Sequence, residues 1–283
     1  MKTYLYYWIT FVLVMKASFT FATGQSADII YINDEKWALF ALPLETDSLV
    51  HEKIKNILPE NRSISTGNWV GYTAYWVLHE NVLYLQQIQV PMYNKKSKQS
   101  YTEYFTVDTL KSLFPNYITK FGIEARWFSG EIRTGRGKVV RYEHSGFDRN
   151  MNQEYIMSFK NGKLTSKHLY HNLILQKNNE SDLKNSVFNA FLPTLIKDDS
   201  IGNYRHIKMY KNEFTQDGFL KDCELNFTYQ KKGSKDLFIK IKDQQHKYIK
   251  ELKQILKELF VQDRYYINGQ YKEEKKKSFE FFF

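Results

Sequence analysis

The sequence contains little cysteine, little proline and no long hydrophobic segment. Of its 283 residues, one is cysteine and 5 are proline. A single thiol, that of Cys223, forms no disulfide within the chain, so the folded state depends on its apolar core and hydrogen bonds. So few prolines exclude a long, rigid, proline-rich spacer. The longest apolar stretch, residues 4–15, falls well short of the roughly 20 residues that a membrane-spanning helix needs.

The N-terminus has the pattern of an export signal. Lys2 supplies a positive charge, the apolar stretch follows, and small residues occur around Ala22 and Ala27. This order of charged, apolar and small-residue regions is typical of a cleaved secretory signal peptide. We predict a signal peptide over residues 1–24 and a periplasmic or secreted mature protein that is not an integral membrane protein after cleavage. Retention of the segment as a short anchor stays open as the alternative.

Aromatic and basic residues are abundant. Phe, Tyr and Trp make up 17% of the chain, and such residues favour half-buried strands but also suit stacking on a sugar or peptide ligand. The formal net charge is +10, which could attract an acidic partner or a glycan. The basic residues are interleaved with acidic ones, as in residues 272–277, and this indicates a solvated surface. Without a basic motif in an exported chain, we expect no nucleic-acid partner.

Residues 28–170 show the pattern of an aromatic-rich, mostly antiparallel α+β domain. A short helix is predicted from Asp47 or Ser48 to Pro59, and a longer amphipathic helix over residues 107–121. Polar residues 91–104 predict a loop. The dipeptide Asn161-Gly162 predicts a tight hairpin turn. Strands are predicted at residues 28–32, 37–42, 68–79, 82–90, 125–128, 138–143, 154–160 and 163–170.

The remaining chain reads as a linker and a second domain. Residues 171–190 have linker composition, and we place a domain boundary there. In residues 191–283, Asp217-Gly218 and Asn268-Gly269 predict turns. The clearest helix of the sequence spans residues 244–261, with apolar residues at helical spacing. A short helix or buried run is predicted around Pro193, and strands at residues 205–214, 219–229, 236–241 and 277–283.

Residues 205–283 contain, in order, a hairpin, a helix that ends at 252–259, the segment 266–270 and a terminal strand. This order of elements resembles the TonB C-terminal domain. That family carries a Trp-x-Pro segment between the helix and the Asn-Gly turn, where this sequence has residues 261–265 instead. The resemblance implies a small ββαβ domain. It also implies contact with the TonB box of an outer-membrane transporter.

A second group of motifs occurs in residues 28–170. In these motifs the sequence resembles an uncharacterised domain of Gram-negative secreted proteins that often precedes a TonB-like end. The resemblance implies no site residues. The matching residues are Trp69, Gly71, Tyr72, Ala74, Trp76, 83–85, 127–132, Tyr142, His144 and Gly146.

His168 and His171 are the only close pair of histidines. Residues three apart on a strand face opposite sides, which is poor geometry for one shared metal. A structural site also needs four ligands, and nothing nearby in the sequence completes the set. We therefore predict no metal-binding residue.

His144, Ser145 and Asp148 have the residue types of a nucleophilic triad. Neighbours on an extended chain point apart, so they do not form the relay. No Gly-x-Ser-x-Gly elbow occurs elsewhere in the sequence. We expect His144 to order the turn around Gly146.

A stretch rich in glycine and arginine could bind an anion. A phosphate-binding loop leads from a strand into a helix N-terminus, but this stretch lies between two predicted strands, so we predict a hairpin turn. Arg133 and Arg136 stay candidates for contact with an anion or an acidic glycan. The residues are Gly130, Gly135, Gly137, Arg126, Arg133, Arg136 and Arg141.

Two further candidates are a carboxylate pair and the thiol. Glu131 and Glu143 would serve as glycosidase acids only at a separation of about 5 to 9 Å, which the sequence does not establish. Cys223 shares one side of an alternating segment with Leu225 and Phe227. We predict a buried thiol without a nucleophilic role.

These patterns predict an α+β protein with an antiparallel N-terminal domain and a small TonB-like C-terminal domain. We expect a binding or adaptor protein of the cell envelope, without catalytic activity or cofactor, whose sheet edge pairs with an extended peptide of a partner protein. One alternative is a TonB-type energy transducer, which needs a retained anchor and a proline-rich span. The other is a glycan-binding or hydrolytic secreted protein that uses exposed aromatic residues.

Overall fold

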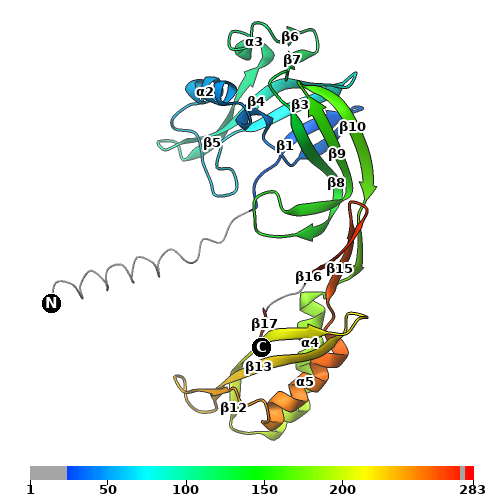
Figure 1. The fold of residues 1–283 in the computed structure, drawn as a ribbon. Coiled ribbons are helices and arrows are strands. Elements are labelled where there is room, and N and C mark those ends of the chain that lie inside the picture. Colours follow the sequence, from blue (N-terminus) through cyan, green and yellow to red (C-terminus); the bar gives the residue numbers. More distant parts are fainter. Residues whose placement is uncertain (1–23, 275–277) are drawn as a thin grey trace, which may run out of the picture. The chain divides into compact units, whose positions relative to one another are not determined.

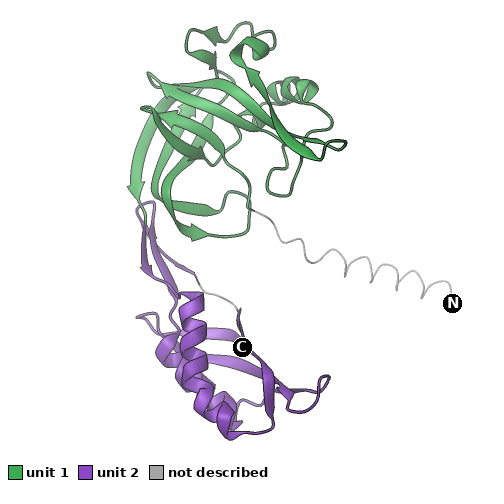
Figure 2. Cartoon of the chain, turned by 180° about the vertical axis from the view of Figure 1, so that it is seen from behind, with its two compact units in different colours: residues 1–172 green, residues 173–283 purple. Residues whose placement is uncertain are grey.

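The computed structural model describes residues 24–274 and 278–283, so the predicted signal peptide lies outside the described residues except for Gly24. The chain divides into two compact units, residues 1–172 and residues 173–283 (Figure 2). Each unit contains helices and sheets, and strands predominate, so the fold is mixed α+β. In the described part of the chain, no helix is both long and apolar enough to cross a membrane.

One curled sheet, here called the main sheet, forms most of the N-terminal unit (Figure 1). The helical segments η1 (Pro43–Glu45), α2 (Ser48–Ile57) and α3 (Val107–Leu110) lie in its connections. Its strands are β1 (Asp28–Ile32), β2 (Glu35–Leu39), β3 (Thr73–His79), β4 (Val82–Asn94), β5 (Gln99–Thr106), β6 (Ile118–Thr119), β7 (Gly122–Glu124), β8 (Gly130–Tyr142), β9 (Arg149–Lys160) and β10 (Lys163–His171).

The main sheet curls until two of its strands meet. Its order is β10-β9-β8-β2-β1-β3-β4-β7-β6, with β5 also paired to β4. Lys163 of β10 pairs with Val82 of β4, and the Leu83 N–H donates to the Gly162 carbonyl oxygen at 2.9 Å. β1 and β3 run parallel. The strands from β10 through β1 to β4 therefore form a closed ring at this end.

Alternating side chains of these strands fill the interior of the ring. Ile30 and Leu39 from the first hairpin, and Trp76 from β3, are almost completely buried. Ile54 of α2 joins the same apolar cluster. Burial of each such side chain stabilises the fold by about 1.5–3 kcal/mol.

Local sequence signals are confirmed at two hairpins and one helix of this unit. Asn161 and Gly162 have φ angles of 50° and 76°, and the residue pair Asn33 and Asp34 also has positive φ. These are the angles that a tight turn with the twist of the flanking strands requires. Asp47 caps α2, because its Oδ1 accepts hydrogen bonds from the backbone N–H groups of the next turn at 2.9 and 3.0 Å.

The predicted amphipathic helix over residues 107–121 is wrong. Only Val107–Leu110 is helical, and turns and the short strand β6 follow. Pro115 explains the end of the helix, because proline lacks an N–H and disfavours helical geometry in the residue before it, Phe114. Leu110 and Phe114 are nevertheless buried. The apolar spacing thus reflected burial and not a helix.

The loop predicted at residues 91–104 is also wrong. β4 continues to Asn94 and β5 starts at Gln99, and they pair from Gln87 with Thr106 to Asn94 with Gln99. On β4 the buried Ile88, Val90 and Met92 continue the apolar alternation past residue 90. The mostly polar sequence of residues 93–103 hid the rest of the hairpin. The strand predicted at 125–128 is instead a turn, in which the Phe128 N–H donates to the Ala125 carbonyl oxygen at 2.9 Å.

The C-terminal unit combines two sheets with two packed helices. The C-terminal sheet has the order β14-β13-β12-β17, and the small sheet has the order β11-β15-β16. Helices α4 and α5 lie side by side against one face of the C-terminal sheet (Figure 2). The elements are β11 (Leu173–Gln176), α4 (Glu180–Lys197), β12 (Ile201–Phe214), β13 (Leu220–Lys231), β14 (Phe238–Ile241), α5 (Lys247–Leu259), β15 (Asp263–Ile267), β16 (Gln270–Glu274) and β17 (Ser278–Phe282).

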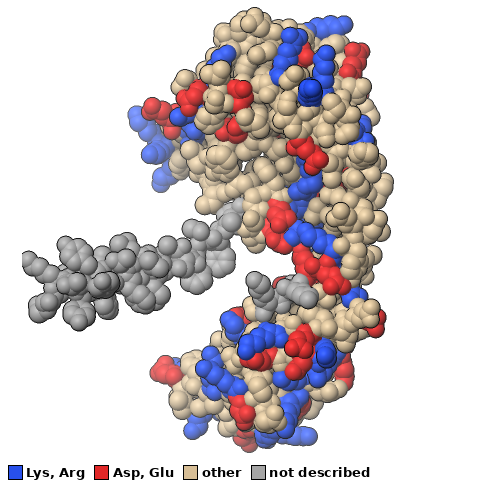
Figure 3. Space-filling model, viewed as in Figure 1, with Lys and Arg blue, Asp and Glu red and all other residues tan. Residues whose placement is uncertain are grey.

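The helix predicted at 244–261 is confirmed as α5. It buries Ile249, Leu252 and Leu256 against the sheet, and the His246 side chain accepts a hydrogen bond from the Tyr248 N–H at its start. Lys and Arg side chains alternate with Asp and Glu over the visible surface of this unit (Figure 3). The charges are therefore interleaved there, as the sequence indicates.

The linker predicted at 171–190 is replaced by ordered structure. β11 pairs with β15, and α4 begins at Glu180. The polar residues between them make specific bonds. The Asn178 N–H donates to Asp263 at 3.1 Å, and Asn179 accepts from the Ser181 N–H at 3.2 Å as the cap of α4. Their polarity thus serves capping and buried hydrogen bonds.

Candidate functional site

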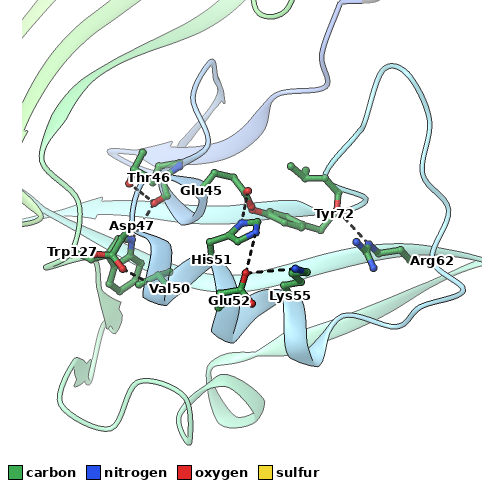
Figure 4. A network of polar contacts seen from close by, with 12 residues as sticks. Glu45, Thr46, Asp47, Val50, His51, Glu52, Lys55, Arg62, Tyr72 and Trp127 are labelled. Atoms are coloured by element: carbon green, nitrogen blue, oxygen red, sulfur yellow. Dashed lines mark hydrogen bonds and ion pairs between the residues drawn. The ribbon is translucent and has the colours of Figure 1, made fainter.

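A carboxylate with two partners forms a polar cluster beside a pocket of the N-terminal unit (Figure 4). Glu45 ends η1, and its Oε1 accepts a hydrogen bond from the Tyr72 hydroxyl at 2.5 Å. Its Oε2 lies 2.7 Å from Nδ1 of His51 on α2. Three separate segments of the chain therefore meet at one carboxylate.

Local structure explains why these side chains meet. Pro43 starts η1, since its fixed φ suits the first helical position. Asp47 then caps α2, and His51 lies one turn further on, where its backbone N–H donates to the Asp47 carbonyl oxygen at 2.9 Å. The histidine ring is thereby turned back toward Glu45.

The cluster forms one wall of a pocket of about 170 Å³. The lining also includes the apolar side chains of Ile54, Val70 and Trp69, and the charged side chain of Lys55. Arg62 is held in place by the carbonyl oxygens of Pro59 at 3.1 Å and Val70 at 3.4 Å. The pocket thus combines fixed charges of both signs with an apolar surface.

A second carboxylate is buried close to this cluster. Asp28 accepts a hydrogen bond from the Ala74 N–H at 2.8 Å and one from Trp76 Nε1 at 3.1 Å. Burial raises the pKa of the Asp28 carboxyl to about 7, although these two hydrogen bonds act to lower it. Burial also raises the pKa of Tyr72, and the negative charges of Asp28 and Glu45 raise it further.

The partners of His51 are carboxylates. In the described residues, His51 contacts the carboxylates of Glu45 and Glu52 and no hydroxyl or thiol group. A His-activated nucleophile needs a hydroxyl or thiol within hydrogen-bond reach of the ring. The cluster therefore orients His51 and orders η1 against α2.

Sequence reasoning missed this cluster. Glu45 and His51 are 6 residues apart on two helical segments, and Tyr72 is 27 residues from Glu45, so no spacing rule connects them. Of its parts, the sequence indicated only the cap Asp47 and the motif that contains Tyr72. The hydrogen bond from Tyr72, just before β3, to Glu45 completes the cluster.

The two histidines considered for a metal lie on β10. His168 pairs with Ile156 of β9, and His171 pairs with Gln153. Within the part of the chain that the structure describes, no group of three or more His, Cys, Asp or Glu side chains is arranged to hold a metal ion.

The triad-like residues form a turn after β8. The Asp148 carboxylate pairs with Arg141, and the Asp148 N–H donates to the Ser145 carbonyl oxygen at 2.8 Å. His144 lies against Tyr142, with 3.5 Å between its Nδ1 and the Tyr142 hydroxyl oxygen. Gly146 has a φ of 46°, which suits glycine at the turn.

The hairpin turn predicted in the glycine- and arginine-rich stretch is wrong, because residues 130–142 form the single long strand β8. A register shift between Arg136 and Val139 accommodates Gly137. Arg133 is bound to the buried carboxylate of Glu154 at 2.7 Å, and Arg136 pairs with Glu35. These pairs occupy the side chains that were considered for an anion.

The carboxylate pair and the thiol also have clear positions. Glu131 and Glu143 are separated by extended chain at about 3.3 Å per residue, roughly 40 Å in all, which exceeds any glycosidase spacing. Glu143 pairs with Arg141. Cys223 is buried in the core with Leu225 and Phe227, as predicted, and burial raises the pKa of its thiol to about 11.

The C-terminal sheet offers a different kind of site, the outer edge of β17. β17 pairs with β12, and no other described strand pairs with it. Phe283 and Arg205 exchange backbone hydrogen bonds at 2.9 and 3.3 Å. Bonded pairs alternate along antiparallel strands, so Phe281 also bonds to β12. The N–H and C=O groups of Glu280 and Phe282 then point away from it.

Side chains hold β17 firmly against β12. Phe279 and Phe281 enter the core. On the opposite face, Glu280 accepts from Lys208 at 2.6 Å, and the Phe282 ring stacks on His206 with 4.3 Å between ring centroids. The edge is therefore a rigid row of backbone donors and acceptors. Comparison of the chain with protein-family models, curated proteins and solved structures yields no match.

Proposed function

We propose that this chain is an exported adaptor protein of the cell envelope without catalytic activity. Its C-terminal unit binds an extended segment of a partner protein, which adds as a strand beside β17. The observation that carries the proposal is the outward-facing backbone of Ser278, Glu280 and Phe282, on which no described strand lies.

The composition of β17 supports this role. Proteins usually protect exposed sheet edges with lysine, proline or bulges. β17 contains no lysine and no proline, and its one charge, on Glu280, is paired with Lys208. β14 at the opposite edge of the same sheet carries Lys240. Of the two edges, β17 is therefore the less protected.

The order of elements and the N-terminal segment support the location and the mode of binding. β12, β13, α5 and β17 follow one another as ββαβ, with β14, β15 and β16 inserted. This agrees with the proposed TonB-like character of the unit. An N-terminal segment with the pattern of a signal peptide would deliver the protein to the compartment in which such partners lie.

A proline substitution tests the proposal without touching the pairing with β12. Glu280→Pro removes an N–H that faces away from β12, and proline is tolerated at such edge positions. Glu280→Gln is the matched control, because it removes the charge and keeps the N–H. From solubilised cell envelopes, we expect the wild type and Glu280→Gln to capture the same partner, and Glu280→Pro to lose it.

Hydrogen exchange then places the partner on the chain. The amides of Glu280 and Phe282 should exchange more slowly in the complex, because they become hydrogen-bonded. Equal capture by Glu280→Pro and wild type, or unchanged exchange at both amides, would contradict binding at this edge.

A further inference from the structure

One face of the main sheet combines tyrosines with amide and hydroxyl side chains. It lies where β1, β3, β4 and β5 are neighbours, on the side opposite the core, and we call it the tyrosine face. Beside the aliphatic Ile29 and Val77, its residues include Tyr31, Thr73, Tyr75, Gln87, Gln89, Pro91, Tyr93, Thr102 and Tyr104.

The strand register places these side chains on one face. Gln89 pairs with Thr73 on one side and with Tyr104 on the other. Paired residues of neighbouring strands share a face, and residues two apart along a strand do as well. The intervening residues Ile88 and Val90 are completely buried in the core. The tyrosine face therefore points outward from the ring.

The hydroxyl groups of three tyrosines gather near the middle of this face. The Tyr75 hydroxyl donates to Gln89 Oε1 at 2.9 Å. Burial raises the pKa of Tyr75, and the neighbouring hydroxyls of Tyr31 and Tyr104 add to the increase. Tyr104 is 58% exposed and Tyr93 43%. Two rings are thus free for contact beside an ordered row of polar groups.

The middle of the face, around Tyr75, Gln89 and Tyr104, carries no charged residue although 25% of the chain's residues are charged. The nearest charges lie at its two ends, Lys36 opposite Tyr31 on β2 and Lys95 and Lys96 in the pocket that Tyr93 lines. Without a charged side chain, this part of the face offers a ligand ring contacts and hydrogen bonds but no ionic contact. A face of rings, amides and hydroxyls instead matches a neutral ligand that is itself rich in hydroxyl groups.

We propose that the tyrosine face binds a neutral polysaccharide. Sugar rings would lie against the exposed rings of Tyr104 and Tyr93, which present a flat apolar surface. Sugar hydroxyls would exchange hydrogen bonds with Gln87 and Gln89, whose amides both donate and accept. The open edge of β5 leaves room for a chain longer than the face. This site lies in the N-terminal unit and is independent of β17.

Titration calorimetry with defined sugars tests the site. The probes are maltohexaose, cellohexaose, chitohexaose and mannohexaose, with hexagalacturonate as the acidic counterpart. We expect at least one neutral hexasaccharide to bind and hexagalacturonate to bind more weakly. Tyr104→Ala should weaken binding by between about two- and tenfold, the loss that one aromatic contact causes.

Tyr101→Ala is the matched control. Tyr101 lies on the same strand and is 46% exposed, but it pairs with Met92 and so shares the face of the core. Tyr101 lines a pocket with Tyr93 but does not neighbour Tyr104 on its face, so its replacement should weaken binding clearly less than Tyr104→Ala. The proposal is overturned if no neutral hexasaccharide binds at about 10 mM, if both variants weaken binding equally, or if Tyr104→Ala impairs only the capture of a protein.

Discussion

The two units treat the edges of their sheets differently. In the N-terminal unit, β10 meets β4 and most strands of the main sheet close into a ring, from which β5 extends with a free edge among the described strands. In the C-terminal unit, the described strands leave the sheet open between β14 and β17. Closure satisfies backbone groups within the chain, whereas an open sheet presents them to other molecules.

This difference separates two modes of recognition. The closed sheet offers the outward faces of its strands, so its contacts are made by side chains such as Tyr104. The open sheet offers backbone groups, so its contacts depend on strand pairing and little on sequence. A single chain of this design would recognise a sugar surface and a protein segment by unrelated chemistry.

The first test truncates one buried leucine in the core of each unit. Leu85→Ala in β4 and Leu252→Ala in α5 each remove a completely buried side chain, at a cost of up to about 5 kcal/mol. Each unit has its own apolar cluster, so each variant should destabilise one unit.

Tryptophan fluorescence distinguishes the two outcomes. Four of the 5 tryptophans, Trp37, Trp69, Trp76 and Trp127, lie in the N-terminal unit, and the fifth lies in the predicted signal peptide. In urea, Leu85→Ala should lower the fluorescence midpoint, and Leu252→Ala should change only the circular dichroism. An equal fall of the fluorescence midpoint in both variants would show that the cores unfold as one.

A pH titration sharpens the comparison. Burial raises the pKa of Asp28 from 3.8 to about 7, so between these values the folded state holds a proton that the unfolded state has released. The stabilisation is complete below pH 3.8 and is lost as the pH rises toward 7, by about 4 kcal/mol in total. Fluorescence-monitored urea midpoints at pH 5 and pH 8 measure the fall.

The carboxylate of Glu280 should make the stability of the C-terminal unit depend on pH in the opposite direction. A hydrogen bond from Lys208 lowers the pKa of Glu280, so its contribution is present above pH 4.5 and is lost as the pH falls. Asp28→Asn should remove most of the fall seen by fluorescence. A fluorescence midpoint that rises from pH 5 to pH 8 would contradict the assigned burial of Asp28.

The smallest effect concerns the closure of the ring. Gly162 has a φ of 76°, and a Cβ there would lie 2.7 Å from the Ala125 carbonyl oxygen. Gly162→Ala should therefore cost about 2 kcal/mol, partly from strain and partly from the clash. Hydrogen exchange at Leu83 and Leu164, whose amides bond across the closure, should accelerate.

Gly233→Ala supplies the control from the C-terminal unit. Gly233 has a similar φ of 83°, but nothing lies within 4 Å of an added Cβ. This variant introduces the backbone strain without the clash, so it should lower the free energy of unfolding by about 1 kcal/mol. Equal losses of unfolding free energy in the two variants would mean that the backbone around Gly162 shifts to make room for the added Cβ.

Features determined by neighbouring residues could be predicted from the sequence. The Asn161-Gly162 turn, the Asp47 cap, the apolar stripe of α5 and the burial of Cys223 all depend on a few adjacent residues. The failure at residues 107–121 has a local cause too, since Pro115 was present in the sequence and outweighs the apolar spacing.

The remaining features depend on contacts between distant segments. Nothing in β10 or β4 alone indicates that Lys163 pairs with Val82. The Glu45, His51 and Tyr72 cluster exists only once the segment before β3 meets η1 and α2, and β5 contains no aliphatic residue whose spacing could reveal it. The tyrosine face likewise becomes visible only through the register of its strands.

The pairing of Lys163 with Val82 has a consequence for how the chain acquires its structure. The two residues are about eighty positions apart in the sequence, so joining them restricts a long loop. Contacts between such distant residues slow folding. We expect β3 and β4 to form a hairpin early and to wait for β9 and β10 before the ring closes. During synthesis, β5 and β7 pair with β4 between Tyr84 and Asn94 before β10 emerges, and only the start of β4 at Val82 waits for β10. The ring therefore stays open until β10 has emerged.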